Sequence, residues 1–287
     1  MTEFKIAAFA DEAAAGLDGQ INALRRNGIE LIELRSLDGF NVVNLGFRKA
    51  LNAAAKLQKA GIGVWSIGSP IGKTGIDGDL GAHLEAFKRC LDLADVFGAK
   101  HLRMFSFYVD PGEKRRDHGG LFRKVAAGLS EFVNASAGRG VVLCHENEKG
   151  IFGERPEDCI LIHREFPEIK AVFDPANYLQ AGEAALPAFE MLEEYVEYLH
   201  IKDLDLKTGE VVPAGRGDGD IPEILRRFKR GTLTIEPHLK VFKGLEKLER
   251  EGGRSAVGNA YGSRKAAFDA AVEGLAACLP AAQTPDP

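Results

Sequence analysis

The sequence predicts a single (β/α)8 TIM barrel. A helical segment that ends near a glycine and leads into a short β-branched run recurs along the first half of the chain. These glycines, Gly28, Gly61, Gly98 and Gly138, are 33, 37 and 40 residues apart in turn, a span that holds one strand and one helix. Alternation of strands and helices indicates a parallel sheet. Eight such units in 287 residues are typical of a closed barrel, which usually has about 250 residues.

The predicted elements follow one another in a regular order. The eight strands are expected near residues 4–9, 29–34, 62–67, 101–106, 141–146, 169–174, 196–201 and 232–236. The helix before the fourth strand is the clearest, because Leu80, Leu84, Phe87, Leu91 and Ala94 share one face. The four glycines suit the left-handed position that ends a helix. Later helices are expected over residues 182–195 and 221–230.

One domain is predicted, because no linker interrupts the pattern. Residues 1–280 are assigned to the barrel, and residues 281–287, AAQTPDP, to a disordered tail. A doubly wound open sheet is the alternative fold. It is weakened because no GxGxxG sequence follows the first strand.

The composition is that of an ordinary globular protein, with 45% hydrophobic and 28% charged residues. The net charge of −5 and the lack of a long basic run argue against a nucleic-acid or membrane partner. No signal peptide or membrane-spanning run is recognisable, and the four cysteines are scattered. We therefore expect a cytoplasmic protein with reduced thiols.

Ionisable residues close the last four predicted strands. In a barrel of this kind the active site lies at the carboxyl ends of the strands. Side chains alternate between the two faces of a strand. In VVLCHENEKG (residues 141–150), this alternation places Glu146 on the same face as Val142 and Cys144, whereas His145 faces away from the barrel axis.

The same parity turns Asp174, His200 and Glu236 inward beside Glu146. Three carboxylates and one imidazole in one interior site are costly unless a cation offsets them. Three oxygens and one nitrogen suit one divalent metal ion, Mn²⁺, Co²⁺, Mg²⁺ or Zn²⁺. The alternative is that each residue makes a separate polar contact at the rim.

These motifs, CHENE, VFDPAN, YLHIKD and LTIEPH, resemble the xylose isomerase-like TIM-barrel superfamily, the sugar phosphate isomerase/epimerase family. The resemblance implies a metal held by Glu146, Asp174, His200 and Glu236. It also implies a sugar isomerase or epimerase that transfers a proton next to a carbonyl through an enediolate. By similarity to ketose 3-epimerases, Glu146 and Glu236 would act from opposite sides of a small-molecule sugar, phosphorylated or not, and a homodimer is what relatives suggest.

Five further residues are candidates for substrate binding. Arg35 and Arg103 can hold substrate oxygens or a phosphate, or form rim salt bridges. Lys202 shares parity with His200 and can polarise the carbonyl, or pair with Asp203 or Asp174. His238 lines the mouth or faces solvent, and Arg216 lies in the glycine-rich loop PAGRGDGD, which touches substrate in related families.

Other motifs are interpreted as structural. GSPIGKT (residues 68–74) has three residues between its glycines, where a phosphate-binding loop needs four, although Lys73 can still reach the mouth. His83, His118 and His163 lie away from the predicted strand ends.

Three rival functions are considered, and the first of them, DNA repair, is disfavoured by the acidic balance and by the missing histidines. The superfamily includes endonuclease IV, which cleaves DNA at abasic sites. This chain has Asn177 where that enzyme and ketose 3-epimerases carry a histidine, and GRGDGDIP contains no histidine. A metal-dependent dehydratase of an inosose or dehydroshikimate type substrate shares the same metal frame. A non-catalytic sugar-binding barrel is the third.

Overall fold

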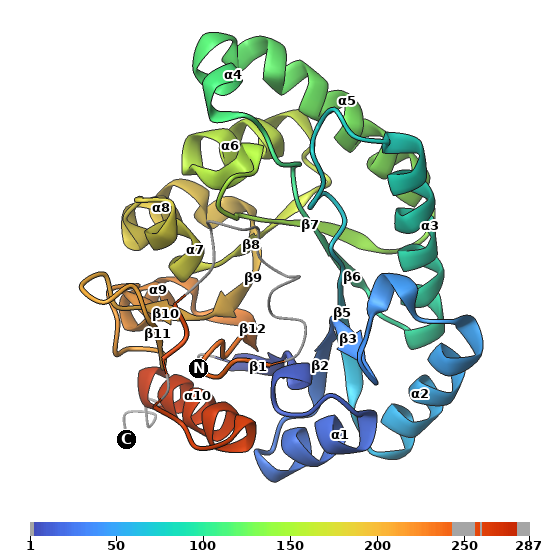
Figure 1. Cartoon of the computed structure of the whole chain (residues 1–287), viewed down its shortest axis with the longest axis vertical. Helices are drawn as coiled ribbons and strands as arrows, with labels where there is room; N and C mark the ends of the chain where they lie inside the picture. The colour runs from blue at the N-terminus through green and yellow to red at the C-terminus, as the bar shows by residue number, and fades with distance from the viewer. Residues whose placement is uncertain (1–2, 243–255, 259, 280–287) are drawn as a thin grey trace, which may run out of the picture.

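The computed structural model describes residues 3–242, 256–258 and 260–279. Its eight barrel strands are parallel and close in the order β1-β12-β9-β8-β7-β6-β5-β2 (Figure 1). They are β1 (Glu3–Ala8), β2 (Leu31–Leu34), β5 (Gly63–Gly68), β6 (His101–Met104), β7 (Val142–Glu146), β8 (Lys170–Phe173), β9 (Val196–Ile201) and β12 (Arg230–Ile235). The predicted TIM barrel is confirmed, and each strand lies within about two residues of its expected position. The tail expected at residues 281–287 lies outside the described residues.

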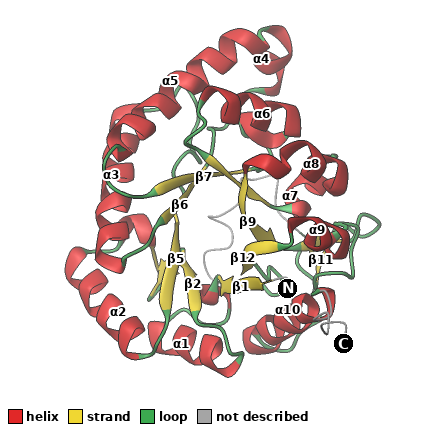
Figure 2. Cartoon of the chain, turned by 180° about the vertical axis from the view of Figure 1, so that it is seen from behind, coloured by secondary structure: helices red, strands yellow, loops and turns green. Residues whose placement is uncertain are grey.

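The helices surround the barrel, as the view from behind shows (Figure 2). The α-helices are α1 (Leu17–Arg26), α2 (Phe47–Lys59), α3 (Leu80–Phe97), α4 (Pro111–Arg116), α5 (His118–Ser136), α6 (Pro156–Glu165), α7 (Pro175–Gln180), α8 (Ala185–Leu192), α9 (Ile221–Phe228) and α10 (Arg264–Cys278). Short 3-10 helices are η1 (Ala10–Glu12), η2 (Val42–Asn44), η3 (Phe152–Glu154) and η4 (Glu193–Tyr195). None of the described helices is both long enough and apolar enough to cross a bilayer.

Helix α3 shows how the local sequence sets an element. Its N-cap residue Asp79 accepts a hydrogen bond from the Ala82 amide, and Gly98 ends it with a φ of 67°. Phe87, Leu91 and Ala94 are fully buried on the face that the sequence predicted. Because this face packs on the barrel, the helix holds β5 and β6 in place.

The elements that were not predicted include two short hairpins and the short helices α4 and α7. The β3–β4 pair (Ser36–Leu37 and Phe40–Asn41) turns at Asp38 and Gly39, both with positive φ. An Asp-Gly turn of this kind is a strong hairpin signal that the apolar pattern did not include. The second pair is β10 (Asp203–Leu204) with β11 (Val211–Val212). Helices α4 and α7 each begin at a proline after an aspartate cap.

The barrel interior has a small apolar floor below the polar mouth. Cys144, Val172 and Tyr198 are buried there, and Trp65 and Val142 pack against them. Leu233 and Ile235 of β12 instead join the large core between strands and helices. The alternation of faces predicted for β7 and β12 is therefore seen, and it sends the residues at the strand ends inward.

Candidate metal centre

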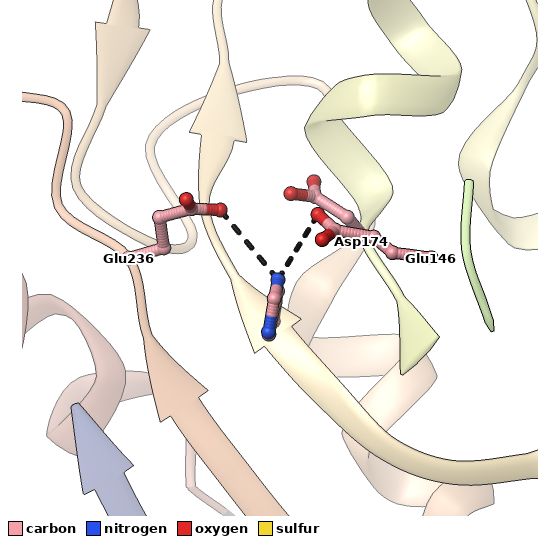
Figure 3. A group of neighbouring side chains, drawn as sticks. Glu146, Asp174 and Glu236 are labelled. Atoms are coloured by element: carbon pink, nitrogen blue, oxygen red, sulfur yellow. Dashed lines mark hydrogen bonds and ion pairs between the residues drawn. The ribbon is translucent and has the colours of Figure 1, made fainter. Parts of the chain in front are cut away.

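Glu146, Asp174, His200 and Glu236 converge at the mouth of the barrel (Figure 3). Each offers one ligand atom, these atoms all lie within 4.8 Å of one another, and all four residues are buried. His200 Nδ1 lies 3.1 Å from Glu146 Oε1 and 3.6 Å from Glu236 Oε2. The structure therefore brings together the four side chains that strand parity selected. Their role as metal ligands stays a prediction.

Asp174 is held in place by the helix that follows it. It is the N-cap of α7, and its Oδ1 accepts a hydrogen bond of 3.0 Å from the Asn177 amide. Its backbone amide donates to Asn147 Oδ1, and its backbone carbonyl accepts from Asn147 Nδ2. The second carboxylate oxygen, Oδ2, is thus left to face the cluster.

His200 is oriented by a hydrogen-bonded chain from the barrel floor. Its Nε2 lies 3.2 Å from Glu33 Oε2, and the Tyr198 hydroxyl donates to Glu33 Oε1 over 2.9 Å. A carboxylate on the far ring nitrogen directs Nδ1 at the cluster, as in metal-binding histidines. Burial lowers the pKa of His200, but Glu146 and Glu33 raise it to about 10. A metal ion at Nδ1 would replace the proton that His200 carries there.

Glu146 is fixed by Arg103 and Asn177. Arg103 Nη1 donates to Glu146 Oε2 over 3.1 Å, and Asn177 Nδ2 donates to Glu146 Oε1 over 3.2 Å. Arg103 Nη2 donates to the Gly68 carbonyl. Both terminal nitrogens of the guanidinium are therefore engaged, one of them with Glu146. Burial raises the pKa of Glu146, but His200 and Arg103 lower it to about 2, which keeps this carboxylate ionised.

Glu236 lies between two cations. Arg35 Nη1 donates to its Oε1 over 2.9 Å, and Lys202 Nζ donates to its Oε2 over 3.2 Å. Lys202 Nζ is also 2.9 Å from Asp174 Oδ2. Burial opposes the charge on Lys202, but Asp174 and Glu236 raise its pKa well above its ordinary value. Of the pairings expected for Lys202, the structure shows the one with Asp174.

Arg35 is fully engaged by carboxylates. It donates to both oxygens of Asp11 at 3.0 Å, to Glu12 Oε1 at 2.9 Å and to Glu236, and its guanidinium lies over the Phe9 ring. Substrate binding was one expectation for Arg35. The ion-pair alternative is what the structure shows, in the interior and not at the rim.

The remaining substrate candidates differ in position. His238 lies at the mouth, with Nε2 3.4 Å from both Glu236 Oε1 and Glu12 Oε1. Arg216 does not join it: its side chain is exposed and lines a separate cavity with Tyr261 and Cys278 beside α10. The loop turns this way because Asp203 binds the backbone amides on either side of Arg216.

Two acidic residues of the mouth were not selected from the sequence. Asp11 and Glu12 lie in η1, close after β1, where a 3-10 turn removes the strand parity that selected the four cluster residues. The sequence FADE at the end of the first strand was the available signal. Burial raises the pKa of Glu12 to about 8, against the lowering effect of Arg35.

The three histidines interpreted as structural bind groups outside the cluster, and His118 Nε2 lies 2.6 Å from Asp158 Oδ1. His83 accepts a hydrogen bond of 2.7 Å from the Gly72 amide, and His163 Nδ1 lies 3.0 Å from the Ile169 carbonyl. Gly72 has a φ of 88°, and a Cβ there would lie 2.0 Å from the Phe105 carbonyl. Gly72 of GSPIGKT therefore allows the chain to pass close to the Phe105 backbone.

The donor set fits a divalent metal ion. Three carboxylates and an imidazole nitrogen meet in a buried site, and each has a supporting hydrogen bond. Asp174 Oδ2 is buried and accepts no hydrogen bond, although Lys202 Nζ is near it. Such sites discriminate poorly among Mn²⁺, Co²⁺, Mg²⁺ and Zn²⁺.

The fold and the cluster together define an α/β barrel with a polar site at the carboxyl ends of its strands. The profile of the xylose isomerase-like TIM barrel family matches residues 21–251, and the chain belongs to this family. A search of curated proteins finds no match.

Solved structures share the fold at low sequence identity. A D-psicose 3-epimerase from Clostridium cellulolyticum H10, solved with D-tagatose, is 14% identical over 96% of this chain and 98% of its own, with a TM-score of 0.71. The probable 3-DHS dehydratase AsbF of Bacillus anthracis is 12% identical over 96% and 98%, with a TM-score of 0.70. A xylose isomerase-like TIM barrel protein from Mycobacterium smegmatis, in complex with magnesium, is 14% identical over 96% and 97%, with a TM-score of 0.64.

Proposed function

We propose that the protein is a divalent-metal-dependent sugar isomerase or epimerase that transfers a proton next to a carbonyl. The observation that carries the proposal is the buried set of four ligand atoms within 4.8 Å of one another at the carboxyl ends of β7, β8, β9 and β12. The fold is shared with solved structures of sugar epimerases, and this similarity supports the same class. When bound, a divalent ion would polarise adjacent carbonyl and hydroxyl oxygens and stabilise an enediolate.

Glu146 and Glu236 are the proposed acid–base pair. They approach His200 from opposite sides (Figure 3), so a sugar carbon between them has one carboxylate on each face. One glutamate removes the proton on carbon, and the other returns a proton to the opposite face or to the neighbouring carbon. Arg103 orients Glu146, whereas Lys202 and Arg35 orient Glu236. The glutamate that acts as the base starts ionised, the one that acts as the acid starts with a proton, and the two have exchanged these states at the end of the reaction.

Replacement of Glu236 by glutamine tests the acid–base role. The protein loaded with Mn²⁺ is incubated with ketoses in deuterated water, and exchange of the carbon-bound proton is followed by NMR. We expect Glu236→Gln to slow exchange by about 100-fold or more, while the exposed Glu165→Gln keeps the parent rate. Parent-like exchange by Glu236→Gln would end the acid–base proposal.

Elemental analysis of the purified protein tests the metal separately. About one divalent ion per chain is expected, and Asp174→Asn is expected to reduce this occupancy. Analysis of the product then distinguishes an isomerised or epimerised sugar from one that has lost water.

A further inference from the structure

A second group of possible ligand atoms lies beside the four-residue cluster. It consists of Glu12, Glu236 and His238, all buried, with one ligand atom each and these atoms within 4.8 Å of one another. Glu236 belongs to both groups. Its Oε2 faces His200 Nδ1 at 3.6 Å and Lys202 Nζ at 3.2 Å, whereas its Oε1 lies 3.4 Å from His238 Nε2. A carboxylate placed in this way can bridge two cations, one on each oxygen.

The Arg35 guanidinium occupies the second group. Its Nη1 donates to Glu236 Oε1 and its Nη2 donates to Glu12 Oε1, each over 2.9 Å. The same two oxygens lie 3.4 Å from His238 Nε2. The guanidinium therefore binds the oxygens that a metal ion would need in this group.

The surroundings of Arg35 suit a planar organic cation. The side chain is buried, and its Cζ lies 4.3 Å from the centroid of the Phe9 ring and 5.4 Å from that of Phe242. Aromatic faces favour a weakly hydrated guanidinium. The carboxylate of Glu12 is also fixed toward it, because its other oxygen accepts a hydrogen bond from the His238 amide.

From this geometry we infer that Arg35 takes the place of a second metal ion and limits the centre to one divalent ion per chain. The guanidinium stays charged at any pH at which the protein is folded, and its charge repels another cation at so short a distance. The inference rests on the proposed metal centre and adds its stoichiometry and the residue that sets it. Arg35 is a positioning residue in this scheme, since it acts through Glu236.

The number of ions bound by Arg35→Met tests the inference. Methionine keeps an unbranched side chain but removes the charge and all N–H donors. The full chain is equilibrated with Mn²⁺ at pH 8, because burial raises the pKa of Glu12 to about 8 and an ion has to displace that proton. We expect elemental analysis to find about one ion in the parent and about two in Arg35→Met, the second with a Kd below about 1 mM by calorimetry.

Electron paramagnetic resonance gives a second readout that is independent of activity. Two Mn²⁺ ions bridged by Glu236 couple magnetically. The spectrum of an isolated ion is expected in the parent and that of a coupled pair in Arg35→Met.

Two further variants control for the loss of a buried arginine. Arg103→Met also removes a guanidinium from a cluster glutamate, Glu146, but no second ligand group that includes Glu146 occurs among the described residues. It should bind no more than one ion. Arg35→Met combined with His238→Gln lacks one ligand of the second group and should lose the second ion.

One ion in Arg35→Met, two ions in the parent or a second ion in Arg103→Met overturns the inference and leaves the proposed function standing. An Arg35→Met protein that does not fold even with Mn²⁺ also contradicts it, because the ion then fails to replace the guanidinium. No ion in the parent would instead refute the proposed metal centre, and the inference with it.

Discussion

Arg35 is buried between three carboxylates and an aromatic ring, and this surrounding gives it a different role from the one its position first indicated. Strand parity could place Arg35 at the mouth. It could not say which acidic group the guanidinium would bind, because Asp11 and Glu12 come from a separate turn that enters the site in three dimensions. When a long side chain has several partners within reach, packing decides which of them it binds. The order of residues in the sequence does not contain that information.

Replacement of Arg35 by lysine is expected to lower kcat and leave the sugar KM within about twofold. Lysine keeps one positive charge but cannot bridge Asp11, Glu12 and Glu236 together, so Glu236 loses its orientation. The loss of these buried pairs should lower the free energy of unfolding by about 3 kcal/mol. Steady-state kinetics and urea unfolding measure the two effects.

Arg26→Lys is the control for Arg35→Lys, since Arg26 forms a partly exposed ion pair with Asp269, and it should change stability by less than about 1 kcal/mol. A raised KM with an unchanged kcat in Arg35→Lys would show instead that Arg35 binds substrate.

At the scale of elements, Asp203 organises the glycine-rich loop that follows β9. Its carboxylate accepts hydrogen bonds from the amides of Leu204, Gly215, Gly217 and Gly219, all between 2.9 and 3.0 Å. A Cβ at Gly219 would lie 3.4 Å from Pro175, so the loop packs beside the start of α7. We call these four hydrogen bonds the Asp203 clamp. The clamp accounts for the glycines of the motif GRGDGD.

Loss of the Asp203 clamp should loosen the loop before it affects the barrel. In Asp203→Ala, four amides lose their acceptor, and we expect a drop of about 3 kcal/mol in the free energy of unfolding. Amide hydrogen exchange at Gly217 and Gly219 should become much faster, while exchange in β9 stays protected.

Asp218→Ala is the matched control for Asp203→Ala, because exposed Asp218 accepts one side-chain bond, from the Leu206 amide. Unchanged exchange at both glycines in Asp203→Ala would contradict the clamp.

The contact between β7 and α6 contains two buried histidines whose protonation is unfavourable. Burial lowers the pKa of His145 to about 3 and that of His163 to about 4. The unfolded chain binds these protons below its pKa of about 6.5, so the folded state binds fewer. Stability is full above that pH and falls as the pH decreases, by about 2 kcal/mol for each histidine at pH 5.

Urea unfolding at pH 7 and pH 5, in the presence of a chelator, measures this effect. His163→Gln should lose less stability than the parent over this interval, by about 2 kcal/mol. The comparison cancels the titration of the groups at the mouth, which both proteins share. An identical loss in the two proteins would indicate that His163 does not titrate with unfolding.

At the scale of the whole molecule, the fold was more predictable than the site. Repeated alternation over eight units determines a closed barrel almost regardless of any one element, so small errors at the strand ends did not matter. The four cluster residues followed from that frame because parity is a local property. Short irregular elements such as η1 and the β3–β4 hairpin were not predicted, because they depend on single turns and not on periodicity.

Closure of the barrel also links metal binding to folding. The proposed ligands Glu146, Asp174, His200 and Glu236 come from the ends of four neighbouring strands, and an unfolded chain offers no such set. Mn²⁺ at 100 times its Kd should therefore raise the free energy of unfolding by about 2.7 kcal/mol, and a chelator should remove this gain together with activity.

Asp174→Asn separates the metal effect from the packing of the same residue. Burial raises the pKa of Asp174 to about 7, so its carboxyl is partly protonated at neutral pH, and an asparagine can still accept the α7 capping bond. Metal-free stability should thus stay within about 1 kcal/mol of the parent, while the gain on adding Mn²⁺ is lost. Exposed Asp218→Asn should keep the full gain. A gain in Asp174→Asn equal to that of the parent would mean that the ion binds elsewhere.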